Sequence, residues 1–116
     1  MISDVFCKII KGELPAEVIY KDDDFLVIKD INPQAPVHLL IIPIKHYDSL
    51  EDFLEKKDTA LLGKALMTAH KVSHQVGIAE KGYRIILNEG EHGGKLVPHF
   101  HIHLLGGKRL GPKLVK

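Results

Sequence analysis

One nine-residue segment, in which histidines alternate with apolar residues, constrains this chain more than any other feature. From Val97 to Leu105 the order is Val-Pro-His-Phe-His-Ile-His-Leu-Leu. Successive side chains of a β-strand point to opposite faces of its sheet. A strand over residues 97–105 therefore has three imidazoles on one face. The other face carries apolar side chains, which belong in a core.

Two kinds of chemistry use such a histidine face, metal binding and catalysis at phosphorus. The outer pair, His99 and His103, would be about 13 Å apart in a strand that rises about 3.3 Å per residue. The ligand nitrogens of one zinc ion lie within roughly 4 Å of each other, so a single ion does not easily take all three rings. A neutral imidazole is a nucleophile near pH 7, and His101 has a histidine on either side to hold phosphate oxygens or move a proton. We favour nucleophilic attack on a phosphate.

The segment that leads into this strand is consistent with a phosphate site. It reads Asn88-Glu-Gly-Glu-His-Gly-Gly-Lys95, and glycines let backbone amides come close to an anion. It is not a P-loop, because its glycines lack that spacing and a strand follows it in place of a helix. Taken alone, the segment would be interpreted as a glycine-rich turn.

The remaining hydrophobic pattern predicts an α+β fold. Strands are expected over residues 17–20, 25–30, 38–43, 83–88 and 97–105. A short helix is expected over residues 5–10, capped by Ser3 or Asp4, and a long one over residues 58–76, ended by Gly77. The long helix has an apolar stripe at helical spacing, made of Leu62, Ala65, Leu66, Ala69, Val72, Ser73 and Val76. We expect one domain over residues 1–116, with the main helix on one face of a five-stranded antiparallel sheet.

Composition excludes several classes of protein. The chain has 116 residues, and 16 basic against 15 acidic side chains leave a net charge of +1. This balance argues against electrostatic binding to nucleic acid or to a membrane surface. No stretch approaches the roughly 20 apolar residues of a membrane span. A single cysteine cannot form an internal disulfide, so we expect a reducing, cytoplasmic location.

Several motifs together resemble the histidine triad family, in particular its Hint-like branch of purine nucleoside phosphoramidate hydrolases. The run His99-Phe-His-Ile-His103 looks like the family signature. Further agreement extends over nearly the whole chain. It includes the segments Val5–Ile10, Asp30–His38, Ile41–Pro43, Gly82–Arg84, Asn88–Gly90, Gly93–Gly94 and Leu104–Gly107.

The resemblance implies a reaction and roles for four histidines. The enzyme would hydrolyse purine nucleoside 5′-monophosphoramidates without a cofactor, through a nucleotidyl-histidine formed on His101. The carbonyl group of His99 would fix the tautomer of His101, and His103 would bind the phosphate. His38 would orient His101. The resemblance also implies a homodimer whose two sheets join into one.

The resemblance assigns a nucleotide pocket as well. Asp30 would bind the ribose hydroxyls, while Asn88 and Gly94 would line the sugar–phosphate site. The purine slot would consist of Val5, Phe6, Ile9, Ile28 and Ile31. The chain departs from the family pattern at Lys95 and Leu96, where Gln and then Ser or Thr are usual. The hydroxyl expected to assist the leaving group is therefore absent, and Lys95 is a candidate to supply charge or a proton in its place.

Some alternatives stay open. The same superfamily contains dinucleoside polyphosphate hydrolases and nucleotidyl transferases, and a nucleotide-binding or partner-interaction module would also carry these motifs. Some relatives hold a structural zinc ion on a Cys-x-x-Cys pair and two histidines. The corresponding residues here are Asp4, Cys7, His46 and His99. Because the Hint-like branch generally lacks the ion, we expect no metal. His70, His74 and His92 are expected to face solvent.

Overall fold

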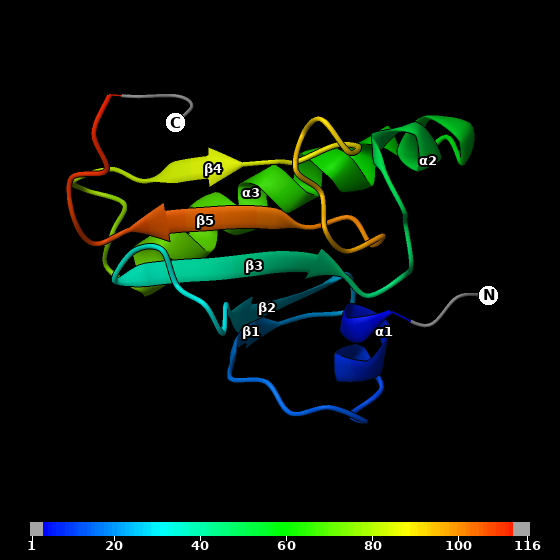
Figure 1. Ribbon diagram of the computed structural model, residues 1–116, viewed down its shortest axis with the longest axis horizontal. Coiled ribbons are helices and arrows are strands. Elements are labelled where there is room, and N and C mark those ends of the chain that lie inside the picture. The colour runs from blue at the N-terminus through cyan, green and yellow to red at the C-terminus, as the bar shows by residue number, and fades with distance from the viewer. Residues whose placement is uncertain (1–3, 113–116) are drawn as a thin grey trace.

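A five-stranded antiparallel sheet forms the centre of the molecule (Figure 1). The computed structural model describes residues 4–112. The strands are β1 (Val18–Lys21), β2 (Phe25–Lys29), β3 (Val37–Pro43), β4 (Arg84–Ile86) and β5 (Ile102–Gly106), in the order β1-β2-β3-β5-β4. The helices are α1 (Val5–Ile10), α2 (Leu50–Glu55) and α3 (Thr59–Gln75). The predicted α+β fold, with one main helix and a short N-terminal helix, is confirmed.

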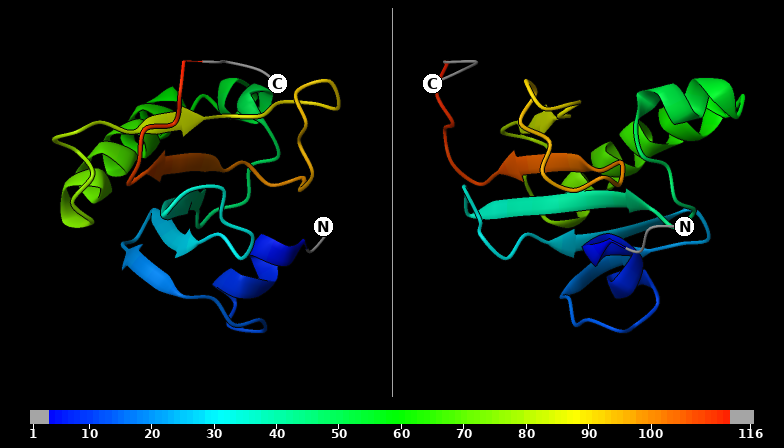
Figure 2. Two further views of the ribbon diagram at one scale, coloured as in Figure 1. Left: turned by 60° about the vertical axis from the view of Figure 1, so that its left-hand side comes forward. Right: turned by 45° about the vertical axis from the view of Figure 1, so that its right-hand side comes forward.

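The helices cover opposite faces of this sheet (Figure 2). Alternating residues of β2 divide between the two faces, since Phe25 and Val27 pack under α3 whereas Leu26 and Ile28 pack against α1. The larger core, on the α3 face, also contains Phe100, Ile102 and Leu104. The alternation predicted for the histidine segment therefore holds for its apolar residues. Its histidines face the side that carries α1.

The histidine segment is a shorter strand than we expected. β5 begins at Ile102 and not at Val97. Pro98 has no N–H to donate to a neighbouring strand, and the N–H of Phe100 donates to the carbonyl of Tyr47, outside the sheet, at 2.6 Å. The chain is thus bent before β5, and His99 and His101 lie in this bent lead-in.

Three other features correct the expected elements. We predicted no helix over residues 50–55, where the structure has α2, which carries the buried Phe53. Within α3, Leu66 is 46% exposed, and Thr68 takes a buried position instead. β4 covers Arg84–Ile86, less than the predicted 83–88. Among residues 4–112, no helix is long and apolar enough to cross a bilayer.

Helix α1 begins as predicted, with Asp4 as its cap. The carboxylate of Asp4 accepts a hydrogen bond from the N–H of Cys7 at 2.8 Å, which satisfies one of the free amides at a helix N-terminus. The other candidate cap, Ser3, lies outside the described residues. The cap matters for the site because it holds the helix that carries Phe6 against the histidine face.

Candidate active site

A row of four aromatic rings crosses the α1 face of the sheet. It runs from Phe6 on α1 to His101, then to His103 on β5 and to His38 on β3. The ring centroids are 4.9 Å, 5.1 Å and 5.2 Å apart in that order. His103 pairs with Leu40 in the antiparallel β3–β5 register, two residues from His38. The sheet therefore brings together two histidines that are 65 residues apart in sequence.

His101 has one nitrogen fixed as a donor and the other left free to react. Its Nδ1 lies 2.7 Å from the carbonyl oxygen of His99. A carbonyl can only accept, so Nδ1 carries the proton and Nε2 presents a lone pair. Burial lowers the pKa of His101, and the charge of Lys95 lowers it further, against the hydrogen bond to His99, which raises it. His101 is therefore a neutral imidazole near pH 7, which is the nucleophilic form.

A second chain of hydrogen bonds fixes His103. The backbone N–H of Gln34 donates to Nδ1 of His38 at 3.0 Å. The proton of neutral His38 is then on Nε2, which donates to Nδ1 of His103, also at 3.0 Å. Nε2 of His103 is left with a proton, so this ring offers an N–H donor beside His101. We expected His38 to orient His101, but its ring contacts His103 instead.

The environment of His103 keeps its ring neutral. Burial, together with the neighbouring His101 and His38, lowers the pKa of His103 to about 4, and the carboxylate of Asp30 opposes this shift. The ring is therefore a neutral hydrogen-bond donor at physiological pH. Such a donor can bind a phosphate oxygen without taking up a proton.

Asp30 lies at the end of the ring row. Its Oδ2 is 3.4 Å from Nε2 of His38, and its Oδ1 accepts the N–H of Asn32 at 2.8 Å. Asp30 thus both stabilises the following turn and presents a carboxylate to the site.

The residues expected to form the purine slot occupy different environments. Phe6 and Ile28 are buried together, and Ile9 packs against the same cluster. Val5, in contrast, is 42% exposed and Ile31 is 90% exposed. The structure therefore brings three of the five into one apolar cluster, next to the ring row through Phe6.

The glycine-rich loop is closed by its own hydrogen bonds. The side-chain amide of Asn88 donates to the carbonyl of Gly93 at 2.6 Å. A Cβ atom on Gly93 would lie 2.2 Å from the carbonyl oxygen of Glu89, so only glycine fits there. Gly94 has φ of +79°, in the left-handed region that favours glycine. Ile86, the last residue of β4, pairs with His103, so this loop leaves the sheet beside the histidine segment.

Lys95 joins this loop to the segment before α2. Its Nζ donates to the carbonyl of Asp48 and lies 3.2 Å from Oε2 of Glu89. The other oxygen of Glu89 accepts the N–H of Leu50, the first residue of α2, at 2.6 Å. The next residue, Leu96, is 93% exposed. We did not anticipate the contacts of Lys95 with Asp48 and of Glu89 with Leu50, because partners 47 and 39 residues apart leave no local signal.

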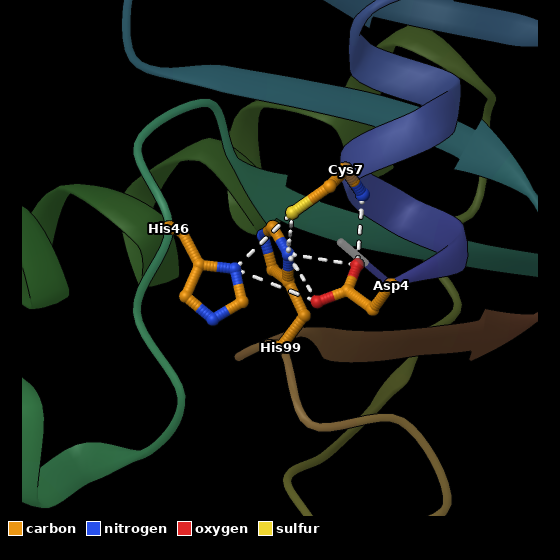
Figure 3. A group of neighbouring side chains, drawn as sticks. All are labelled: Asp4, Cys7, His46 and His99. Carbon is orange, nitrogen blue, oxygen red and sulfur yellow. Dashed lines mark hydrogen bonds and ion pairs between the residues drawn. The ribbon is translucent and has the colours of Figure 1, made fainter. Parts of the chain in front are cut away.

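Figure 3 shows a second group of polar side chains, which lies next to the ring row because the ring of its His99 is 5.8 Å from that of Phe6. Asp4 and Cys7 come from the start of α1, His46 from the segment after β3, and His99 from the lead-in to β5. One ligand atom from each residue lies within 4.8 Å of all the others. The ring of His99 is fully buried in this group. His99 forms its hydrogen bond with His101 through its backbone carbonyl group and not through its ring.

The remaining histidines lie outside both groups. His70, His74 and His92 are exposed, as predicted. Nδ1 of His70 is 2.6 Å from the hydroxyl of Tyr83. Of the basic residues near the C-terminus, Lys113 and Lys116 lie outside the described residues.

The fold and the ring row define an α+β domain built around a histidine site on one sheet face. The chain belongs to the histidine triad family, because residues 11–110 match the HIT domain. It is 46% identical to the purine nucleoside phosphoramidase of Escherichia coli strain K12 over 110 residues, which cover 95% of this chain and 92% of that protein.

Solved structures agree with this assignment. A HIT family hydrolase from Clostridium thermocellum superposes with a TM-score of 0.93 at 48% identity, covering 99% of both chains. A zinc-bound histidine triad family protein from Mycobacterium smegmatis superposes with a TM-score of 0.77 at 32% identity, covering 97% of this chain and 80% of that one.

Proposed function

We propose that this protein hydrolyses the P–N bond of purine nucleoside 5′-monophosphoramidates and releases the nucleoside monophosphate. The observation that carries the proposal is the bond from Nδ1 of His101 to the carbonyl of His99 at 2.7 Å, which leaves Nε2 as a free nucleophile. The choice of substrate is supported by 46% identity to a purine nucleoside phosphoramidase.

The reaction has two steps. Nε2 of His101 attacks the α-phosphorus, the P–N bond breaks, and the amine takes up a proton from solvent as it leaves. Water then attacks the phosphorus of the nucleotidyl-histidine and gives up a proton to solvent, the new N–P bond breaks, and His101 regains its lone pair. Nε2–H of His103 donates to a phosphate oxygen in both steps. Charge that develops on that oxygen is thereby stabilised by a donor already in place.

The nucleotide would contact both the apolar cluster and the ring row. The base would lie against the apolar cluster of Phe6, Ile9 and Ile28. The ribose hydroxyls would bind the carboxylate of Asp30, and the sugar–phosphate would contact Asn88 and Gly94. Lys95 would stabilise the glycine-rich loop, because its ammonium group binds Glu89 and the carbonyl group of Asp48.

We include a homodimer in the proposal. β4 is at one end of the sheet, so one of its edges is available for pairing. The contact of His70 with Tyr83 places one flank of α3 beside the chain that enters β4. Leu66 and Met67 lie on that flank, four and three residues before His70, and are 46% and 63% exposed. The apolar flank of α3 lies next to the unpaired edge of β4, so two copies of the chain could join their sheets through β4 and bury this flank between them.

The location we propose is cytoplasmic, since the single cysteine indicates a reducing compartment.

A paired substrate assay tests the proposed activity. Adenosine and guanosine 5′-phosphoramidates are compared with a dinucleoside polyphosphate, using wild type and His101→Ala. We expect kcat/KM to be higher for the phosphoramidates and turnover to disappear in the variant. Preference for the polyphosphate would make the chain a dinucleoside polyphosphate hydrolase. Equal, very slow turnover of all substrates would indicate a nucleotide-binding module.

A further inference from the structure

Asp30 follows the last residue of β2 and lies opposite His38 of β3. The N–H of Asp30 donates to the carbonyl of His38 at 3.0 Å, one residue past the Lys29–Leu39 pair of the antiparallel register. Oδ2 of Asp30 lies 3.4 Å from Nε2 of His38, and the two side chains are 18% and 5% exposed. The strand pair therefore places a carboxylate beside an imidazole of the ring row, in a region largely shielded from solvent.

The turn between β2 and β3 fixes the orientation of both groups. The N–H of Gln34 donates to Nδ1 of His38 at 3.0 Å, so the proton of the neutral ring is on Nε2. The N–H of Asn32 donates to Oδ1 of Asp30 at 2.8 Å, which leaves Oδ2 on the side of His38. The side-chain amide of Gln34 also donates to the carbonyl of Asn32 at 3.1 Å and holds the turn together.

The single proton on Nε2 of His38 has two acceptors within reach. Nδ1 of His103 lies 3.0 Å away, and Oδ2 of Asp30 lies 3.4 Å away. The nitrogen is nearer, whereas the carboxylate carries a charge, and hydrogen bonds to charged acceptors are stronger than those to neutral ones. Asp30 therefore competes with His103 for the same N–H.

The outcome of this competition decides whether His103 is ready to bind a phosphate. When the proton of His38 points at His103, Nδ1 of that ring is an acceptor and its Nε2 carries the proton that a phosphate oxygen needs. When the proton points at Asp30, Nδ1 of His103 loses its donor. The neutral ring of His103 can then carry its proton on Nδ1, and the lone pair on Nε2 would repel a phosphate oxygen.

We infer that Asp30 is a positioning residue, which makes the phosphate donor of His103 depend on the hydroxyls of the bound ribose. The inference rests on the proposed function, in which those hydroxyls bind Asp30. Hydroxyl groups that donate to the carboxylate occupy its lone pairs and disperse its charge, so its attraction for the proton of His38 weakens. The proton stays on Nε2 of His38 and turns fully towards His103. A ribonucleotide substrate thereby prepares the donor for its own phosphate.

Single-turnover rates separate this role from simple binding. Adenosine 5′-phosphoramidate and its 2′,3′-dideoxy counterpart are each reacted with a saturating excess of wild-type protein. A contact that only binds the ribose would change the half-saturating concentration and leave the maximal rate unchanged. We expect the maximal rate to be about fivefold lower for the dideoxy compound, the scale of one hydrogen bond. Equal maximal rates would overturn the inference and leave the proposed activity intact.

Asp30→Asn removes the competing acceptor. The amide oxygen of asparagine still accepts the N–H of Asn32, and an NH₂ group, which has no lone pair for the proton of His38, takes the place of Oδ2. We expect both compounds to bind more weakly to this variant and to reach the same maximal rate. Asp23→Asn, the same change at an exposed residue, should keep the fivefold difference. A difference that persists in full in Asp30→Asn would overturn the assignment to Asp30.

Nitrogen NMR of wild type observes the proton of His38 without any turnover. In protein labelled with ¹⁵N-histidine, saturating adenosine should shift the Nε2–H signal of His38 and the Nδ1 signal of His103, because the proton turns from one acceptor to the other. Saturating 2′,3′-dideoxyadenosine should shift both signals much less. These shifts need no hydrolysis, so they separate the inference from the proposed activity. Shifts of the same size with both nucleosides would overturn the inference.

Discussion

Single hydrogen bonds from the backbone decide which nitrogen of each active-site histidine can react. The N–H of Gln34 fixes His38 and, through it, His103, while the carbonyl of His99 fixes His101. In both bonds the partner of the imidazole is a backbone group, which no sequence motif marks. His101 and His103 could be predicted from their alternation and His38 from the resemblance, whereas their tautomers depend on the bend before β5 and the turn before β3.

The pH dependence of stability should report the burial of His103. The pKa of His103 is about 4 in the folded protein and 6.5 when unperturbed. As the pH falls through 6.5, the unfolded chain takes up a proton that the folded one does not. The free energy of unfolding therefore falls between pH 6.5 and 4, by at most about 3 kcal/mol from this group. Urea denaturation over this range should give a smaller decline for His103→Gln, and equal declines would contradict the assigned burial.

Leu96 tests the role of the missing hydroxyl. The side chain is 93% exposed, so a smaller polar residue fits without repacking. We expect Leu96→Ser to raise kcat for substrates with an amine leaving group by up to about 100-fold, the scale of one proton-transfer contact. Leu96→Ala is the matched control and should give no gain. If serine also gives none, the leaving group is assisted from elsewhere in the site.

Among the helices and strands, the hydrophobic pattern predicted the elements that have a clear periodicity or a capping residue. Helix α3 ends as expected, where Gly77 has φ of +80° and the N–H of Ile78 bonds back to the carbonyl of Ser73. α2 was missed: like α1 it has six residues, but no side chain caps its N-terminus. Leu50, Phe53 and Leu54 do have helical spacing, but what holds α2 is the Glu89 carboxylate and the stacking of Phe53 on Tyr47 at 4.2 Å. Such contacts depend on the fold.

Two glycine substitutions should have opposite effects. In Gly93→Ala, the new Cβ lies 2.2 Å from the backbone oxygen of Glu89, so the loop must move and its link to α2 weakens. We expect a loss of about 1–3 kcal/mol in the free energy of unfolding and a lower kcat/KM. Gly63→Ala, in α3 with open space around its Cβ, should gain about 0.5–1 kcal/mol and keep wild-type activity. A Gly93→Ala enzyme with wild-type stability and activity would contradict the described loop.

At the scale of the whole molecule, the site assembles residues from three regions of the chain. The motif near residue 100 could be predicted, and the resemblance supplied a pocket. The resemblance named Asp4, Cys7, His46 and His99 as one set, but their contacts could not be predicted, since Asp4 and His99 are 95 residues apart. The contact between Lys95 and Asp48 could not be predicted either, because the two residues are 47 positions apart and meet only where their loops pack together.

The proposed dimer leads to a prediction at this scale. A charge on the flank of α3 beside β4 should separate the subunits, because Met67 would be buried between them. We expect Met67→Glu to elute and scatter light as a monomer where wild type is a dimer. Leu54→Glu is the control, since Leu54 is also 63% exposed but lies on α2. A dimer that tolerates Met67→Glu but not Leu54→Glu would place the interface elsewhere.

The central claim is that His101 attacks phosphorus through its free Nε2. Mass spectrometry of protein quenched during turnover of an adenosine phosphoramidate tests it most directly. We predict a nucleotidyl adduct on the peptide that contains His101, located on that residue by fragmentation and absent from His101→Ala. Full turnover with no adduct on His101, or with the adduct on His103, would contradict the account.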